Sequence, residues 1–397
     1  MFQTAIRAIS PASVQIKNVT LATCPATAYI APIYCLPWAC AFMTYRLLPE
    51  WYPQDGIQLT WPRPDGDWAP LLARIEATLE RIVIATTRFQ RVLICVPDEL
   101  TQQRLATTFD AYGVPASRLQ LIVAPTDDTW ARDHGPISVI DDQGQMLMLD
   151  YTFTGWGGKF PAERDNRLTQ WLAEAGVWAC PVATRNLVLE GGGIETDGEG
   201  TLLTTEACLL NPNRNPTLSR EDVEAQLAQD FGVDRVLWLA NGHLEGDDTD
   251  SHIDTLARFC DPTTIAYVRC DDPNDPHYPA LAAMEQALQA FRQRNGEPYR
   301  LIALPWPQAC FDPDDGHRLP ATYANFLIIN QAVLVPTYGD PADVTALHAL
   351  ASAFPEHTLI PIECVSVIRQ HGSLHCLTMQ LPQGTLTQGT LSATAIC

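Results

Sequence analysis

The segment LEGGGIETDGEGTLLTTEACLLNPNRNP, residues 189–216, carries the most informative pattern of the chain. Three consecutive glycines follow Glu190, and a backbone without Cβ atoms can approach other groups closely. We expect strands over Leu187–Glu190 and Thr201–Leu210 on either side of these glycines. A phosphate-binding loop is the alternative, but no GKS or GKT follows, and the neighbouring acids would repel phosphate. The glycines therefore indicate close backbone packing rather than a phosphate site.

Short strands and helices alternate along the rest of the chain. Apolar residues at helical spacing from Trp68 to Val83 predict a helix within 68–89. We expect further helices at 101–112, 166–175, 220–231, 278–294 and 342–354. We expect strands at 91–97, 119–125, 137–140, 146–153, 235–239, 264–269, 301–304, 326–329, 332–336, 359–361 and 374–379. No linker rich in Gly, Ser or Pro divides this series, so we predict a single α/β domain of roughly four or five units, each of strands with one helix.

Residues 1–42 differ from the rest of the chain. No charged residue occurs from Asn18 to Tyr45. A signal peptide or a membrane anchor is one explanation for such a stretch. However, prolines break helix interiors, and they interrupt this stretch at Pro25, Pro32 and Pro37. We therefore expect a poorly ordered N-terminal extension over 1–42 and the folded domain over 43–397.

The charge balance limits the classes of partner. The 397 residues include 46 Asp and Glu against 25 Lys and Arg, for a formal net charge of −21. Nucleic acid and anionic membranes both need a basic surface, so we expect neither as a partner. An acidic protein suits a cationic small substrate. The twelve cysteines are spread out without a CxxC pair, which predicts free thiols and a cytoplasmic location.

Three further segments gather reactive side chains. WARDHGP at 130–136 combines an aromatic ring, bases and an acid in a turn before a strand. DDTDSHID at 247–254 and HGSLHC at 371–376 supply acids, histidines and a cysteine. In an extended chain, His252 and Asp254 would project to the same face. Folding could bring all these groups together with the glycine-rich segment.

Two kinds of site are compatible with these residues. A metal site is one, but the adjacent His375 and Cys376 cannot easily aim at one ion, and no spaced pair of ligands recurs. The other is nucleophilic catalysis by one cysteine, one histidine and several carboxylates. We predict the second and expect no metal.

Taken together, the segments resemble the agmatine deiminases and the related bacterial peptidylarginine deiminases of the guanidine-modifying superfamily. The strings that carry the resemblance are WARDHGP, LEGGGIETDGEGTLLTTEACLLNPNRNP, DDTDSHIDTLARF, YANFLIIN and HGSLHCLTMQLP. They lie in order between Pro49 and Pro382, and LPEWYPQDGIQLTWP, just after Met43, resembles the family's N-terminus. The resemblance implies a five-bladed α/β propeller with pseudo-fivefold symmetry and a site in its central channel. It also supports the assignment of 1–42 as an extension to a deiminase catalytic domain over 43–397.

The resemblance implies a role for each matched residue. These roles are Cys376 as nucleophile, His252 as general acid and base, Asp133 and Asp254 as the carboxylates that hold a guanidinium, Glu190 as the acid that orients the histidine, and Trp130 as an aromatic beside the site. Two carboxylates can hold a planar guanidinium by charge-assisted hydrogen bonds and present its carbon to a thiolate. Loss of ammonia would leave an amidino-cysteine, which water would hydrolyse. Neither a metal nor an organic cofactor is needed.

The resemblance leaves the substrate open. Agmatine, giving N-carbamoylputrescine and ammonia in putrescine biosynthesis, is the first expectation, because no peptide-docking module is recognisable. Peptidylarginine is the second, and a catalytically silent guanidine-binding protein is the third. Two departures bear on this choice: Arg369–Ser373 replaces a run of glycines before the His-Cys pair, and Glu195 stands where a histidine is common. The resemblance is compatible with a homo-oligomer.

Overall fold

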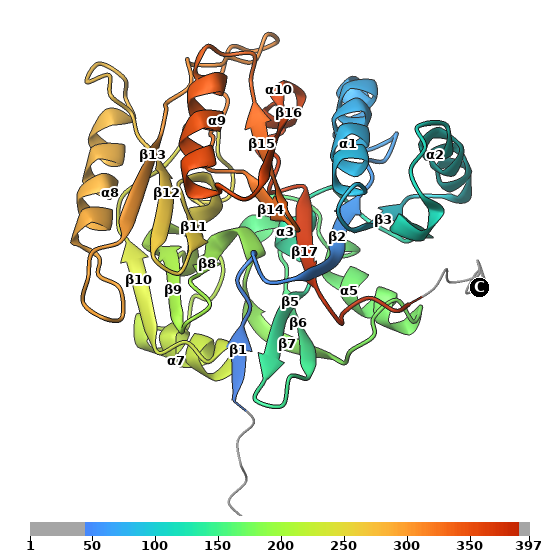
Figure 1. Ribbon diagram of the computed structural model, residues 1–397, viewed down its shortest axis with the longest axis horizontal. Coiled ribbons are helices and arrows are strands. Elements are labelled where there is room, and N and C mark those ends of the chain that lie inside the picture. The colour runs from blue at the N-terminus through green and yellow to red at the C-terminus, as the bar shows by residue number, and fades with distance from the viewer. Residues whose placement is uncertain (1–43, 389–397) are drawn as a thin grey trace, which may run out of the picture. The chain divides into compact units, whose positions relative to one another are not determined.

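Five small sheets of three or four strands each form a mixed α/β fold in the computed structural model, which describes residues 44–388 (Figure 1). The expected extension over 1–42 lies outside the described residues. The sheets have the strand orders β17–β2–β3–β4, β1–β5–β6–β7, β10–β9–β8, β11–β12–β13 and β14–β15–β16. The strands are Tyr45–Leu47 (β1), Gln54–Thr60 (β2), Arg91–Val96 (β3), Leu119–Val123 (β4), Ile137–Asp141 (β5), Met146–Thr152 (β6), Val182–Val188 (β7), Ile194–Thr196 (β8), Thr201–Thr205 (β9), Arg235–Leu239 (β10), Ala257–Asp261 (β11), Thr264–Val268 (β12), Arg300–Leu304 (β13), Leu327–Ile329 (β14), Ala332–Thr337 (β15), Thr358–Glu363 (β16) and Thr378–Pro382 (β17).

One arrangement of strands recurs in the sheets. An antiparallel pair comes first, and its second strand then lies parallel to a third strand that follows a helix. The antiparallel pairs β5–β6, β8–β9, β11–β12 and β14–β15 are thus extended by β7, β10, β13 and β16. In the remaining sheet, β17 is antiparallel to β2, and β2 is parallel to β3. The second strand and the last strand of the described chain therefore pair in one sheet, whereas β1 joins the sheet of β5.

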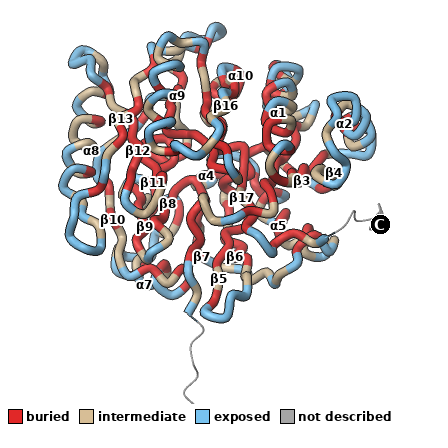
Figure 2. Tube along the Cα trace, in the orientation of Figure 1, coloured by how far each residue is buried: buried red, intermediate tan, exposed pale blue. Residues whose placement is uncertain are grey.

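The helices pack with their apolar stripes against the sheets. They are Leu72–Thr86 (α1), Glu99–Ala111 (α2), Ala131–His134 (α3), Gly155–Gly158 (α4), Asp165–Glu174 (α5), Glu206–Leu209 (α6), Arg220–Phe231 (α7), Tyr278–Ala290 (α8), Ala342–Ala353 (α9) and Val365–Ile368 (α10). In α1, Ile75, Leu79 and Ile82 are fully buried at helical spacing, as predicted. The outward turns of the longer helices are exposed, whereas most strand residues are buried (Figure 2). Among residues 44–388, no helix combines the length and apolarity needed to cross a membrane.

Most predicted elements are present with boundaries shifted by a few residues, but the two ends of the glycine-rich segment differ from expectation. The strand before the glycines is Val182–Val188, so Glu190 lies beyond it, next to a 3₁₀ turn at Gly191–Gly193. The strand predicted over Thr201–Leu210 ends at Thr205. The hydroxyl of Thr205 accepts a hydrogen bond from the Cys208 backbone N–H and so caps the start of the short helix α6.

Two further predictions are wrong near the reactive residues. The strand expected over 374–379 begins only at Thr378, and the residues before it form a turn. The side-chain oxygen of Asn325 holds that turn by accepting from the backbone N–H groups of His375 and Cys376. His252 and Asp254 do not lie in extended chain, because Ile253–Thr255 is a 3₁₀ turn.

Candidate active site

The glycine-rich segment brings three of the predicted residues together. The backbone N–H of Gly192 donates to Oδ1 of Asp133 at 3.1 Å. A Cβ atom on Gly192 would lie 2.5 Å from Nδ1 of His252, 2.8 Å from Oδ1 of Asp133 and 3.2 Å from Oδ2 of Asp254. Glycine is therefore required at position 192. The close backbone approach that the sequence predicts brings this residue against two carboxylates and a histidine of the site.

His252 is fully buried between two acids. Its Nδ1 is 3.5 Å from Oδ1 of Asp133, and its Nε2 is 3.8 Å from Oε2 of Glu190. Both distances exceed an ordinary hydrogen bond, so the ring has contacts with charge on both sides but is not locked by either acid. Burial opposes protonation, yet the charge of Asp133 and contacts with Cys208 and Glu190 raise the pKa of His252 well above its usual value. These contacts favour the protonated imidazole.

Glu190 is itself fixed by a cation. Nε of Arg214 donates to both carboxylate oxygens of Glu190 at 3.1 Å, and both residues are buried. Arg214 also pairs with Asp250 and donates to the backbone oxygen of Thr249. Burial opposes ionisation of Glu190, but His252 and Arg214 lower its pKa. Glu190 is thus a rigid anion beside the histidine, as the sequence prediction requires.

Cys376 lies in the turn before β17, with its side chain almost fully buried. Its Sγ is 3.3 Å from Nδ2 of Asn325 and 3.7 Å from Oδ2 of Asp254. Burial and the charges of Asp254 and Asp133 raise the pKa of the Cys376 thiol well above its usual value. The thiol is therefore protonated in the free protein, and a cation bound between these carboxylates would offset part of that effect.

The pKa values of the two aspartates are shifted in opposite directions. Burial raises the pKa of Asp133 to about 6, although His252 and a 3.0 Å hydrogen bond from the Trp156 indole oppose this shift. Burial acts on Asp254 in the same direction, but His375, whose Nδ1 is 2.8 Å from Oδ2, outweighs it and lowers the pKa of Asp254. Oδ1 of Asp254 is buried without a hydrogen-bond partner among residues 44–388. A buried carboxylate oxygen of this kind can accept from a bound guanidinium.

Cys376 and Asp133 open on one pocket of about 430 Å³, part of it open solvent. Trp130, the predicted aromatic, lines this pocket, and its indole donates to Asp128 at 3.0 Å. A Cβ atom on Gly372 would lie 2.3 Å from the Trp130 ring, so a second glycine is required at the pocket wall. Of the six predicted site residues, Trp130, Asp133 and Cys376 line this pocket, and His252, Asp254 and Glu190 are linked to them by the contacts described above.

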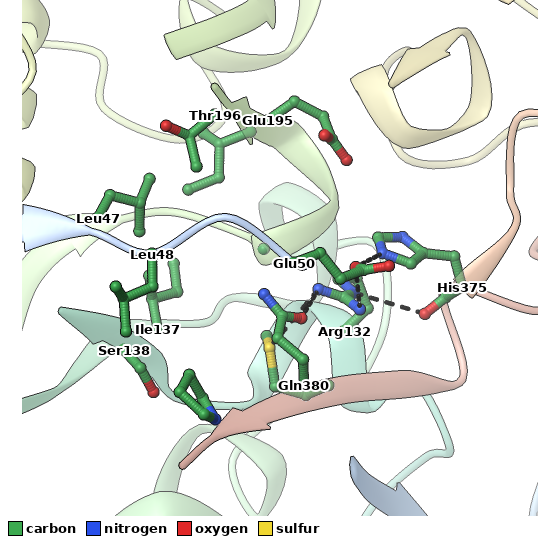
Figure 3. Close-up of a pocket in the computed structure, with 14 residues that line it drawn as sticks. Leu47, Leu48, Glu50, Arg132, Ile137, Ser138, Glu195, Thr196, His375 and Gln380 are labelled. Carbon is green, nitrogen blue, oxygen red and sulfur yellow. Dashed lines mark hydrogen bonds and ion pairs between the residues drawn. The ribbon is translucent and has the colours of Figure 1, made fainter. Parts of the chain in front are cut away.

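A group of buried charges that was not predicted from the sequence lies at a second pocket, which does not contain Cys376. Oε2 of Glu50 lies 2.6 Å from Nε2 of His375, 3.0 Å from Nη2 of Arg258 and 3.3 Å from Nη2 of Arg132. Figure 3 shows Glu50, Arg132 and His375 meeting there. Glu195, the residue noted as a departure, pairs with Arg258. Glu50 lies in the family-like string LPEWYPQDGIQLTWP, but that string does not indicate its role, because its partners are 82 to 325 residues away along the chain.

One group of described side chains has the geometry for a metal ion. Glu190, Cys208 and His252 offer ligand atoms that lie within 4.8 Å of one another. Arg214 already occupies both oxygens of Glu190 and would compete with an ion there. The expectation that the reaction needs no metal stays a prediction.

These features define a buried cysteine, histidine and carboxylate site on an α/β fold of small sheets. Residues 46–382 match the sequence model of the Porphyromonas-type peptidyl-arginine deiminase family, so the chain belongs to that family. The agmatine deiminase of Stutzerimonas stutzeri (strain A1501) is 35% identical over 359 residues, which cover 85% of this chain and 95% of that protein.

Solved structures agree with this assignment. A C. jejuni agmatine deiminase with substrate bound is 36% identical with a TM-score of 0.78, covering 86% of this chain and 97% of that one. A structure assigned as an arginine deiminase from Porphyromonas gingivalis is 48% identical with a TM-score of 0.80, covering 86% of this chain and all of that one. The family resemblance predicted from the sequence is confirmed. The roles of the individual site residues stay predictions.

Proposed function

We propose that the protein hydrolyses the guanidinium group of agmatine to N-carbamoylputrescine and ammonia. The observation that carries the proposal is the convergence of Asp133, His252 and Asp254 around Gly192, with the Cys376 thiol 3.7 Å from Asp254. The curated relatives named agmatine deiminases, at 32–35% identity over 85% of this chain, support the same activity.

The carboxylates bind and orient the substrate. Asp254 offers the unpartnered Oδ1, and Asp133 faces it across Gly192. Together they hold the planar cation by charge-assisted hydrogen bonds and direct its central carbon to Sγ of Cys376. The arriving positive charge offsets the two anions that raise the pKa of Cys376, so the thiol releases its proton to solvent as the substrate binds.

His252 serves both halves of the reaction. The thiolate attacks the guanidinium carbon, and the imidazolium of His252 gives its proton to the leaving nitrogen, which departs as ammonia. The now neutral His252 takes a proton from water, and the resulting hydroxide attacks the amidino carbon. The carbon–sulfur bond breaks, Cys376 is released, and a carbamoyl group remains on the product. Glu190, held by Arg214, provides a fixed negative charge 3.8 Å from Nε2 of His252 that favours the imidazolium.

Ammonia release tests this proposal against its alternatives. Agmatine, free arginine and an arginyl peptide are each given to the wild-type protein and to Cys376→Ala. We expect release from agmatine with the wild type alone. The family description favours an arginyl peptide as the second candidate, and preferential release from it would replace agmatine. If none of the three compounds releases ammonia, the result would support the third alternative, a guanidine-binding protein without catalytic activity.

We further infer a five-bladed α/β propeller for residues 44–388. The support is the recurrence of an antiparallel strand pair, a helix and a parallel strand in each of five sheets, with the last strand β17 paired with the second strand β2. A cytoplasmic location is proposed because the cysteines of the described chain are free: Cys95, Cys180, Cys208, Cys260, Cys270, Cys310, Cys364 and Cys376. Association into a homo-oligomer stays a prediction.

A further inference from the structure

The sulfur of Cys376 must carry a negative charge twice in the proposed reaction. It attacks as a thiolate, and it leaves as a thiolate when the carbon–sulfur bond of the adduct breaks. Burial and the charges of Asp254 and Asp133 raise the pKa of this thiol and so oppose both steps. The substrate cation offsets the two acids during the attack, but the carbamoyl group that forms as the sulfur departs is neutral. A hydrogen-bond donor from the protein would favour the charged sulfur in both steps.

Asn325 is a fully buried residue whose side chain contacts this sulfur. It lies two residues before β14, and its Nδ2 is 3.3 Å from Sγ of Cys376. Its Oδ1 is 3.4 Å from the same atom. The two distances are nearly equal, so they do not by themselves decide which end of the amide serves the sulfur.

Three other contacts fix the orientation of the Asn325 amide. The backbone N–H groups of His375 and Cys376 lie 2.8 Å and 3.3 Å from Oδ1 and can only donate, so that atom is the oxygen. The backbone oxygen of Asp254 lies 3.3 Å from Nδ2 and can only accept, so that atom is the nitrogen. The oxygen already accepts two hydrogen bonds. The nitrogen has one hydrogen left, which it donates to the sulfur.

The segment that carries Asn325 is held in place by buried hydrogen bonds. The hydroxyl of Thr322 donates to the backbone oxygen of Thr255 at 2.7 Å, and its backbone oxygen accepts from the Tyr338 hydroxyl at 2.8 Å. The same Tyr338 hydroxyl lies 2.9 Å from the hydroxyl of Ser373, in the turn before the nucleophile. One network therefore fixes both the amide and the sulfur, and the donor is in position before charge develops.

We propose that Asn325 is a catalytic residue whose Nδ2 stabilises the Cys376 thiolate by a hydrogen bond, an inference that rests on the deiminase function proposed above. A hydrogen bond strengthens when its acceptor is charged, so Nδ2 favours the thiolate over the thiol and over the sulfur of the covalent adduct. It acts at the attack, and again when the electron pair of the carbon–sulfur bond returns to Sγ. Hydrogen bonds from the Ser373 backbone and the Asn325 side chain both lower the pKa of the thiol, against the effect of burial and of the acids.

The pH dependence of alkylation separates this role from a structural one. 2-Chloroacetamidine is a small amidinium cation with a leaving group, and its rate of reaction with Cys376 at saturation follows the thiolate fraction. For Asn325→Ala, we expect a rate about ten- to a hundred-fold lower at neutral pH and a midpoint about one to two pH units higher. At alkaline pH, where the thiol is ionised, the rate should return to within about three-fold of the wild type. A residue that only positioned the turn would lower the rate at every pH and leave the midpoint unchanged.

Tyr338→Phe is the matched control, because it removes hydrogen bonds to Thr322 and Ser373 and leaves Nδ2 of Asn325 beside the sulfur. Its midpoint should stay at the wild-type value. Asn325→Asp is a second variant, in case alanine at this position prevents folding. It keeps an acceptor for the two backbone N–H groups, and its carboxylate, which is ionised in the alkaline range, should also move the midpoint upward.

Ammonia release from agmatine by the wild type tests the underlying function in parallel. An active wild type together with an unmoved midpoint in the Asn325 variants would overturn the role of Asn325 and keep the deiminase function. A midpoint that moves as far in Tyr338→Phe as in Asn325→Ala would overturn that role as well. A wild type that neither releases ammonia nor reacts with the amidinium reagent would overturn the proposed function and the role of Asn325 with it.

Discussion

Nδ1 of His375 lies 2.8 Å from Oδ2 of Asp254, so the residue next to the candidate nucleophile holds one of the carboxylates that face the substrate. The other ring nitrogen lies 2.6 Å from Glu50. Burial opposes ionisation of both acids, but Arg258 and His375 lower the pKa of Glu50, and His375 lowers that of Asp254. The ring of His375 thus bridges the two carboxylates. A chain of Glu50, His375 and Asp254 therefore orients Asp254 and leaves its Oδ1 free.

Replacing Glu50 by Gln should weaken both the fold and the site. The side chain keeps its shape, but two buried arginines, Arg132 and Arg258, lose their shared anion, and His375 loses a charged partner. We expect the free energy of unfolding to fall by about 3 kcal/mol, measured by urea denaturation. The exposed Glu356→Gln should change it by less than about 0.5 kcal/mol. Equal stability of the two variants would show that Glu50 is not a structural anion.

The pH dependence of that difference follows from the lowered pKa of Glu50. A carboxyl with a folded pKa below its unfolded value of about 4.3 stabilises the protein above that pH. The gap between wild type and Glu50→Gln should therefore stay constant from neutral pH to about 5 and shrink below about 4.3. A gap that grew on acidification would contradict the assignment.

Asp133→Asn should separate stability from activity. Burial raises the pKa of this carboxyl to about 6, so ionisation at neutral pH acts against folding. The variant should therefore be more stable by about 1–3 kcal/mol above pH 6, with no gain below about pH 4, where the carboxyl is protonated in folded and unfolded chains alike.

The activity of Asp133→Asn should change in the opposite direction. Loss of one charged partner of a buried cation should lower kcat/KM for agmatine roughly thirty- to a thousand-fold, as should Asp254→Asn. Ammonia release measured beside thermal unfolding tests both effects together. Undiminished kcat/KM in either variant would remove that aspartate from the mechanism.

Gly192→Ala should inactivate the protein without unfolding it. The new methyl group would lie 2.5 Å from His252 and 2.8 Å from Asp133, and these are buried groups with little room to move. We expect kcat/KM to fall by about a hundred-fold or more, because small displacements of positioned groups are costly in catalysis. Gly66→Ala is the control, since its Cβ would meet only ordinary contacts at 3.5 Å. Similar activity in both alanine variants would contradict the role given to Gly192.

The local sequence pattern predicted the positions of the longer helices well, but it missed some of the strands. Helix α7 spans the predicted 220–231, because Ser219 and Asp222 form a capping box and Gly232 ends the helix at a positive φ. Strand β11, by contrast, was not predicted. It contains Arg258, which is almost fully buried, and a charged residue argues against a buried strand until its partners are known. Those partners, Glu50 and Glu195, come from distant parts of the chain.

The candidate site shows the same division. Motif similarity identified the groups that would touch the substrate. It covered Asn325 and Glu50, which lie in the strings YANFLIIN and LPEWYPQDGIQLTWP, but gave no role to either. Asn325 holds the turn at Cys376 from a position 51 residues away. Such supporting contacts depend on tertiary packing that no window of sequence contains. The sequence therefore predicts the residues proposed to react with the substrate, but it does not predict the contacts that position them.

Removal of residues 1–42 should leave a folded and active protein. The prediction rests on the proline-interrupted, uncharged stretch in that segment and on a family match that covers 46–382. Thermal unfolding and ammonia release from agmatine should match those of the full chain. Loss of folding in the shortened protein would place part of that segment in the core.

Selective alkylation of Cys376 is the sharpest test of covalent catalysis. A 2-chloroacetamidine carries a guanidinium-like cation beside a carbon with a leaving group, so Asp133 and Asp254 should draw it to the thiol. Cys208 and Cys364 are also buried, and burial raises the pKa of each, but neither lines the pocket that contains Cys376. The cation that binds beside Cys376 favours its thiolate, whereas nothing in the reagent favours ionisation of the others. Peptide mapping should therefore find one label, on Cys376, and excess agmatine should prevent it.

Two variants separate binding from bond formation in that experiment. Cys376→Ala should take up no label at this site and release no ammonia, while agmatine still binds to the carboxylates that remain. Cys208→Ala should label like the wild type, because its sulfur lies behind Gly193 and not in the pocket. A label on another cysteine, or turnover by Cys376→Ala, would disprove a covalent intermediate on Cys376. Labelling of Cys376 that agmatine fails to prevent would mean that the reagent reaches the thiol without occupying the guanidinium site, and the positions given to Asp133 and Asp254 would then be wrong.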